Sequence, residues 1–80
     1  MYFVYLLSSI NFEFHYVGFT SNLKKRLNEH NEGKTKSNKE YRPFKIVYFE
    51  EIETRENARK REKYFKSAAG RRFLKTKLAS

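Results

Sequence analysis

Eighty residues with a net charge of +9 and no cysteine indicate one small domain, residues 1–80, without disulfides or thiolate metal sites. Eight phenylalanines and six tyrosines must supply much of its core. No hydrophobic run approaches the roughly 20 residues that span a membrane. The apolar start, Met1–Leu7, lacks a basic leader. We therefore expect a strand and not a signal peptide, in a cytoplasmic protein.

The basic residues are concentrated near the end of the sequence. Ten lysines and arginines lie between Arg55 and Lys77, against the two glutamates Glu56 and Glu62. Such a field attracts polyanions, of which nucleic acid is the commonest in a cell. A solvated helical surface is the alternative, and charge alone leaves the two close to even. Exposed large apolar residues do not dominate the opposite helix face, which disfavours a membrane-surface helix.

Two strands are predicted at the start of the chain. Met1–Ser9 has apolar residues on both faces, which is typical of a strand covered on both sides. Phe12–Gly18 forms the second strand, after a turn at residues 9–11. A short loop there places Tyr5 directly opposite Tyr16, so that the two phenols share one face of the sheet. A register slip of one residue would separate them.

A helix follows the second strand. Thr20 or Ser21 can cap it, and it should run to about Asn31. Arg26 and His30 are four positions apart and therefore lie on one edge of the buried stripe. Both side chains can lean towards the sheet.

A polar segment followed by an apolar segment occupies the middle of the chain. Residues 32–43 are too polar to pack and predict a mobile basic loop, which carries Lys34 and Lys36. Phe44–Ile52 is rich in β-branched and aromatic residues and predicts a third strand. No internal repeat or linker indicates a second domain.

A second helix is predicted over about Arg55–Ala68, with Thr54 as its cap. A glutamate occupies the middle of its apolar stripe, where an uncompensated carboxylate is costly. The stripe consists of Ala58, Glu62, Phe65 and Ala69.

A short third helix is predicted after Gly70, which should break the chain. Leu74 and Leu78 face inward on this helix. Its basic side chains remain available to bind a nucleic-acid backbone: Arg71, Arg72 and Lys75.

Each candidate site residue has a structural alternative. Glu62 could bind Mg²⁺, which often needs only one or two protein carboxylates, or it could pair with Arg26. Arg26 could instead grip a phosphate oxygen. His30 could relay a proton or be incidental, and Tyr5 and Tyr16 could be packing residues. The chain offers no cluster of acids on its sheet, so a two-metal site is not supported.

The ordered set of motifs resembles the GIY-YIG endonuclease superfamily. The shared features are Phe3-Val4-Tyr5, then Tyr16-Val17-Gly18, then Arg26 with His30, then Glu62. The likeness covers nearly the whole chain. It is closest to small stand-alone bacterial members, which are described as similar to the N-terminal nuclease domain of an excinuclease.

This resemblance implies an α+β fold, a three-stranded antiparallel sheet flanked by about three helices, and a phosphodiesterase with a single Mg²⁺ or Mn²⁺ ion. Tyr5 would be the base or position the water, and Tyr16 would position the phosphate. Arg26 would stabilise the transition state and Glu62 would bind the metal, with His30 as an auxiliary.

Our hypothesis is a metal-dependent DNA endonuclease acting on branched, nicked or damaged DNA in repair or recombination, with RNA also open. No base-reading helix is evident, so a protein partner would have to supply sequence specificity. The sequence does not give the oligomeric state. The main alternative is a nucleic-acid-binding module that kept the fold and lost turnover. A second alternative is a small protein-interaction domain whose positive charge is incidental.

Overall fold

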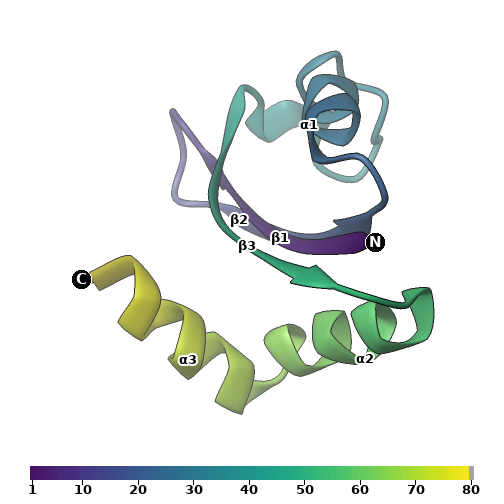
Figure 1. The fold of residues 1–80 in the computed structure, drawn as a ribbon. Coiled ribbons are helices and arrows are strands. Elements are labelled where there is room, and N and C mark those ends of the chain that lie inside the picture. The colour runs from purple at the N-terminus through teal and green to yellow at the C-terminus, as the bar shows by residue number, and fades with distance from the viewer. Residues whose placement is uncertain (80) are drawn as a thin grey trace.

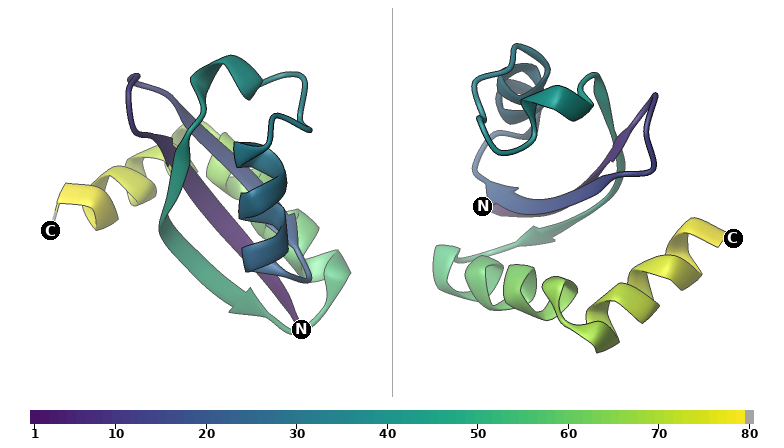
Figure 2. Two further views of the ribbon diagram at one scale, coloured as in Figure 1. Left: turned by 90° about the horizontal axis from the view of Figure 1, so that it is seen from above. Right: turned by 180° about the vertical axis from the view of Figure 1, so that it is seen from behind.

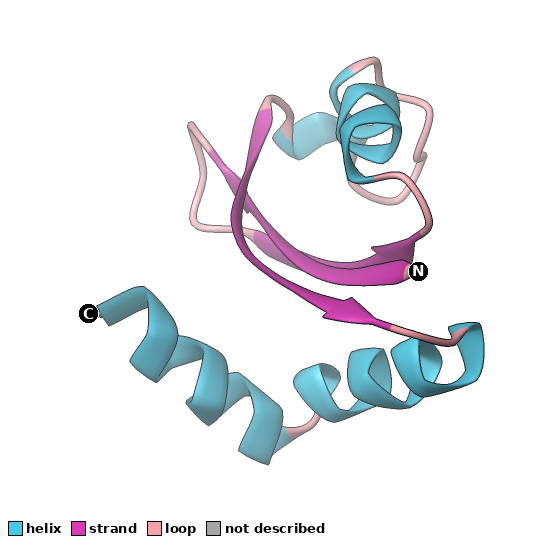
Figure 3. Ribbon diagram, in the orientation of Figure 1, coloured by secondary structure: helices cyan, strands magenta, loops and turns pink. Residues whose placement is uncertain are grey.

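The computed structural model describes residues 1–79 and shows three layers, with an antiparallel sheet between α1 on one side and α2 and α3 on the other (Figure 1). The α+β prediction is therefore confirmed. Strands and helices are separated by short connections (Figure 3). The elements are β1 (Tyr2–Ser9), β2 (His15–Thr20), α1 (Leu23–Asn31), the 3-10 helix η1 (Lys39–Tyr41), β3 (Phe44–Ile52), α2 (Arg55–Lys66) and α3 (Ala68–Ala79).

Strand β1 lies in the middle of the sheet, whose order is β2-β1-β3. Its alternating side chains enter two separate apolar clusters. Val4 and Leu6 pack with residues of α2 and α3, whereas Tyr5 and Leu7 pack on the α1 side. The expectation of a strand covered on both faces is confirmed, and the two further views show the same layering (Figure 2).

The predicted pairing of Tyr5 with Tyr16 is wrong by two residues. Tyr5 pairs with Gly18, and Tyr16 pairs with Leu7. The connection between β1 and β2 is longer than expected because Phe14 leaves the ladder and stacks on the Tyr41 ring, with centroids 4.0 Å apart. A shift of two preserves which face each side chain takes, so the two tyrosine rings remain neighbours at 6.5 Å.

The cap of helix α1 lies one residue after Ser21 and two after Thr20, the two predicted caps. Asn22 is the cap, and its side chain accepts a hydrogen bond from the backbone nitrogen of Lys25 at 3.1 Å. Thr20 supports the turn by accepting from the Asn22 backbone nitrogen at 3.1 Å. The predicted end at Asn31 is confirmed, and Gly33 follows with a positive φ of 80°.

The segment 32–43 packs, contrary to expectation. Asn38 is only 1% exposed, and η1 brings the Tyr41 ring against Phe14. The side chain of Asn31 bonds both backbone groups of Phe44, which ties the end of α1 to the start of β3. Polarity misled the prediction because this packing depends on residues far away in the sequence.

Thr54 caps α2 as predicted, but the break between α2 and α3 falls at Ser67 and not at Gly70. The Ser67 hydroxyl donates to the carbonyl of Tyr64 at 2.5 Å and accepts from the nitrogen of Gly70 at 3.2 Å. Gly70 lies inside α3, where any Cβ would collide with the Tyr64 backbone. Its small size therefore permits close contact between the helices.

Two residues predicted to face inward do not. Ala69 is exposed, and Leu78 is 39% exposed. The exposure of Ala69 follows from the earlier break at Ser67, which ends the stripe of α2 and starts α3 in a new direction. Ala58, Phe65 and Leu74 are buried as expected.

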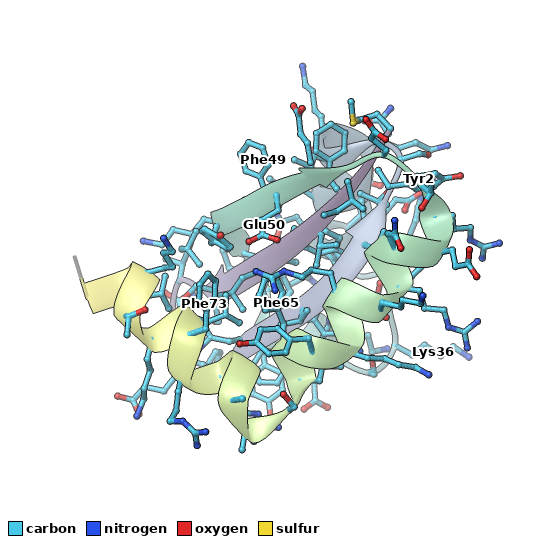
Figure 4. All side chains as sticks on the ribbon, turned by 60° about the horizontal axis from the view of Figure 1, so that its bottom comes forward. Tyr2, Lys36, Phe49, Glu50, Phe65 and Phe73 are labelled. Carbon is cyan, nitrogen blue, oxygen red and sulfur yellow. The ribbon has the colours of Figure 1, made fainter. Side chains whose placement is uncertain are left out.

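An ion pair links α2 to the sheet. Arg61 bonds both carboxylate oxygens of Glu50, at 2.8 and 3.1 Å, and its guanidinium lies over the Phe65 ring. Figure 4 shows Glu50 on the side of the sheet that faces Phe65 and Phe73, with Phe49 on the other side. Among residues 1–79, no helix combines the length and apolar character needed to cross a bilayer.

Candidate active site

Tyr5 is at the centre of the candidate site. Its side chain is 2% exposed, and its hydroxyl lies 3.1 Å from Nε2 of His30. His30 is completely buried in the last turn of α1, so a helix and the central strand meet through this hydrogen bond. The prediction that His30 leans towards the sheet is confirmed.

Gly18 makes room for the Tyr5 phenol. A Cβ at position 18 would lie 2.5 Å from the Tyr5 hydroxyl and 3.1 Å from Cε2 of Tyr16. Real Cβ atoms do not approach other atoms so closely, so the two aromatic rings need a glycine here. The prediction that Gly18 ends the second strand is wrong, because β2 runs from His15 to Thr20.

Tyr16 is the third ring of an aromatic cluster that also contains Tyr5 and His30. Its ring centroid is 6.5 Å from that of Tyr5 and 5.1 Å from that of His30. Tyr16 is partly exposed on the edge strand β2, whereas the other two rings are buried. Its phenol is therefore the more accessible of the two.

Arg26 supplies positive charge beside the buried phenol. Burial raises the pKa of Tyr5 to about 12, and the Arg26 guanidinium opposes this rise. The same guanidinium forms an ion pair with Glu29 at 3.0 Å and remains partly exposed. At neutral pH Tyr5 is thus a protonated phenol beside a permanent cation.

Glu62 does not pair with Arg26. Its partner is Lys66, with 3.4 Å between Nζ and the carboxylate, and the Glu62 side chain is 18% exposed. The negative charge of Glu62 raises the pKa of Tyr5, although less than burial does. The alternative of a sealed Glu62–Arg26 pair is not what the structure contains.

The other four candidate residues therefore all influence the Tyr5 phenol. His30 bonds the Tyr5 hydroxyl, and the other three act on it through space as an arginine, a second phenol and a carboxylate. They come from β1, β2, α1 and α2. The two-residue error in the register of the hairpin does not separate them, because it leaves every side chain on its predicted face.

The donor set fits one hard divalent ion. Among residues 1–79, no group of three or more histidines, cysteines or acids could hold a metal. A lone, partly exposed carboxylate suits Mg²⁺, which commonly uses one or two carboxylates with water and substrate phosphates. Lys66 would have to release Glu62, and exposed pairs of this kind are weak.

Asn38 is a member of this cluster that the sequence did not reveal. Its amide nitrogen lies 3.4 Å from Nδ1 of His30. Burial lowers the pKa of His30, and the charge of Arg26 lowers it further, so the imidazole is neutral. A neutral ring that accepts from Asn38 at Nδ1 carries its proton on Nε2 and donates it to Tyr5.

This arrangement defines what the Tyr5 hydroxyl can do. In that tautomer its oxygen accepts from His30, and its own hydrogen is free for another acceptor. Asn38 lies in a polar segment, and nothing in the sequence marked it as a site residue. Its Oδ1 is buried and has no hydrogen-bond partner among the described residues.

The predicted nucleic-acid-binding cations are all exposed, but they belong to two layers. Lys34 and Lys36 follow α1, and Lys34 pairs with Glu32 at 3.4 Å. Arg71, Arg72 and Lys75 lie on α3, across the sheet.

The sequence model of the GIY-YIG catalytic domain matches residues 1–76. This chain belongs to the GIY-YIG family. The family resemblance drawn from the tyrosine, arginine and glutamate motifs is thereby confirmed. GIY-YIG domains are nuclease domains that generally use a divalent metal, and the family suggests DNA as the substrate.

Bacterial relatives are similar over most of the chain. The UPF0213 protein lwe0147 of Listeria welshimeri is 41% identical over 66 residues, which cover 81% of this chain and 72% of the relative. The UPF0213 protein CPE1444 of Clostridium perfringens is 42% identical over 67 residues, covering 82% and 71%. The UPF0213 protein YazA of Bacillus subtilis is 40% identical over 52 residues, covering 64% and 52%. No solved structure matches significantly.

Proposed function

We propose that this protein is a DNA endonuclease that hydrolyses phosphodiester bonds with one bound Mg²⁺ or Mn²⁺ ion. The observation that supports the proposal is the grouping of His30, Arg26 and Tyr16 around Tyr5, together with a Glu62 charge that raises the pKa of Tyr5. Packing alone would not require a guanidinium and a carboxylate around a buried phenol. The net charge of +9 supports a polyanionic substrate.

In the proposed mechanism, water attacks phosphorus in line with the leaving oxygen. A new P–O bond forms as the bond to the leaving oxygen breaks. Arg26 holds a non-bridging oxygen and stabilises the negative charge that grows there. Tyr16, the more accessible phenol, positions the phosphate.

Tyr5 orients the attacking water in this scheme. Since its pKa is raised to about 12, it acts as a protonated hydrogen-bonding group and not as a free phenolate. The hydrogen bond from His30 fixes the direction of its hydroxyl. The proton lost by the water passes to solvent.

Glu62 would hold the metal ion. A bound divalent cation supplies charge neutralisation at the leaving oxygen. Because the described part of the chain contains no group of three or more histidines, cysteines or acids that could hold a metal, a single-metal mechanism is the one that its residues support.

Cleavage assays test this proposal. Purified protein is incubated with labelled branched, nicked, single-stranded and linear duplex DNA, with Mg²⁺, Mn²⁺ or EDTA. We expect cleavage that EDTA abolishes and that falls at least about 100-fold in Arg26→Ala and in Glu62→Gln. Lys60→Ala, which removes an exposed charge from α2, is the control and should retain the wild-type rate.

The alternative function, a binding module without turnover, gives a different result. It predicts salt-sensitive DNA binding and no metal-dependent cutting by the wild type. Cleavage that survives unchanged in both Arg26→Ala and Glu62→Gln would show a contaminating nuclease and end the proposal. RNA of the same structures is included to define the sugar preference.

A further inference from the structure

A groove of about 550 Å³ lies on the face of the sheet opposite α1, between β2 and the pair of helices α2 and α3. Its walls include apolar side chains from four elements, among them Val17, Leu74 and Leu78. Cations stand beside them, including Lys66, Arg71 and Lys75. The volume falls in the range of pockets that bind small ligands.

The groove adjoins the candidate active site. Tyr16 lines it while also contacting His30 and lying near Tyr5. Lys66 also belongs to both regions, because its ammonium lies 5.9 Å from the Tyr16 ring centroid and pairs with Glu62. A DNA strand held at Tyr16 therefore lies beside the groove.

We propose that this groove binds an unpaired nucleotide next to the scissile phosphodiester, so that the preferred substrate is single-stranded or flap DNA. The inference rests on the proposed nuclease function and extends it by naming the substrate class. An apolar wall with an exposed aromatic ring suits the face of a base, and the basic residues suit its phosphates. A base that is paired and stacked in duplex DNA cannot enter without being extruded.

Charge complementarity favours a nucleotide over an apolar peptide. Lys66, Arg71 and Lys75 all line the groove, and no glutamate among residues 1–79 does. A cationic groove that follows a backbone with stacking surfaces beside it is the general form of single-strand binding sites. An acidic peptide that competes with DNA equally well would count against this assignment.

The first test measures binding without turnover, in EDTA. Fluorescence anisotropy compares a labelled oligothymidylate with an abasic strand of equal length and charge. We expect the oligothymidylate to bind about 10-fold tighter, because only it carries bases to stack. Equal affinities for the two strands would overturn the proposal, since they would show binding to the backbone alone.

The second test locates the bound base. Leu78→Glu introduces a carboxylate at a partly exposed groove position, whereas Thr76→Glu adds the same charge to α3 at a position that does not line the groove. We expect Leu78→Glu to remove the preference for oligothymidylate over the abasic strand and Thr76→Glu to keep it. Identical behaviour of the two variants would place the base elsewhere.

A third pair of variants isolates the basic residues. The double variant Arg71→Ala/Lys75→Ala should weaken oligothymidylate binding about 10-fold. The double variant Lys60→Ala/Lys63→Ala should weaken it by less than about 3-fold. Both pairs remove two positive charges, so net charge alone cannot explain a difference. Equal effects would contradict a role for this groove.

These tests separate the two proposals. Base-dependent binding without any metal-dependent cleavage would support the groove and refute the nuclease. The opposite result would be cleavage of single strands and duplexes at the same rate, with every groove variant keeping the base preference. It would refute the assignment of the groove and leave the nuclease proposal intact.

Discussion

The missing side chain at Gly18 provides the space in which the Tyr5 hydroxyl lies. An alanine there would put its Cβ 2.5 Å from that hydroxyl. Gly18→Ala should therefore displace the phenol, lower the cleavage rate at least about 10-fold and reduce the free energy of unfolding by about 1–3 kcal/mol. Rates on a single-stranded substrate and urea unfolding measure the two effects.

A double variant provides the control for this steric argument. Tyr5→Phe removes the atom nearest to the new Cβ, so Gly18→Ala combined with Tyr5→Phe should cost less stability than the sum of the two single changes. Activity should not return, because the hydroxyl is gone. Strict additivity, or a wild-type rate in Gly18→Ala, would show that the glycine is not needed for this contact.

Within α2, one arginine stabilises the fold rather than binding DNA. Arg61 forms two bonds with Glu50 and lies over the rings of Phe65 and Phe73, at 4.5 and 5.3 Å. Arg61→Ala would leave a half-buried carboxylate without its cation and should reduce the free energy of unfolding by about 2–4 kcal/mol. Chemical denaturation gives this value directly.

Arg59→Ala is the matched change on the same helix. Arg59 is exposed, so its loss should alter stability by less than about 0.5 kcal/mol. Both variants lose one positive charge and should lose DNA affinity by the same factor. A larger affinity loss for Arg61→Ala in folded protein would assign Arg61 to the DNA-binding surface instead.

The helices and strands could be predicted where interactions between neighbouring residues determine the local structure. Phe44–Ile52 was predicted with its exact bounds because β-branched and aromatic residues fill it, and Thr54 was predicted as a cap because its hydroxyl needs only a local backbone partner. The first hairpin was not readable to the residue. Its loop is set by Phe14 stacking on Tyr41, a contact that sequence spacing does not contain.

The site residues that follow from local periodicity could be predicted, and those that depend on tertiary contacts could not. Helical spacing placed Arg26 and His30 on one face of α1, and the strand alternation kept both tyrosines on one side of the sheet. Asn38 and Gly18 were missed because their roles depend on tertiary neighbours, the imidazole and the phenol. Their contributions to catalysis remain predictions.

For the molecule as a whole, a neutral buried imidazole makes stability depend on pH. Burial lowers the pKa of His30 below its usual value of 6.5 in the folded state. Below pH 6.5 the unfolded chain therefore binds a proton that the folded chain does not, so the free energy of unfolding falls as the pH is lowered. The slope should reach at most about 1.4 kcal/mol per pH unit for one proton.

The acidic side chains act in a separate, lower range. Arg26 and Arg61 lower the pKa values of Glu29 and Glu50 from 4.5, so the stability that these carboxylates contribute is present above pH 4.5 and is lost at more acidic pH. Urea unfolding at half-unit steps from pH 7.5 to 3.5 resolves the two ranges. We expect one decline beginning near pH 6.5 and a second beginning near pH 4.5.

Two histidine variants assign the upper decline. His30→Gln keeps a polar group of similar size but cannot be protonated, so the decline below pH 6.5 should disappear in it. His15→Gln changes an exposed histidine and should leave the decline intact. If His30→Gln retains the full upper decline, the buried imidazole is not its source. The hydrogen bond that Nδ1 of His30 accepts from Asn38 would then lose its support, because that bond requires a ring that stays unprotonated in the folded protein.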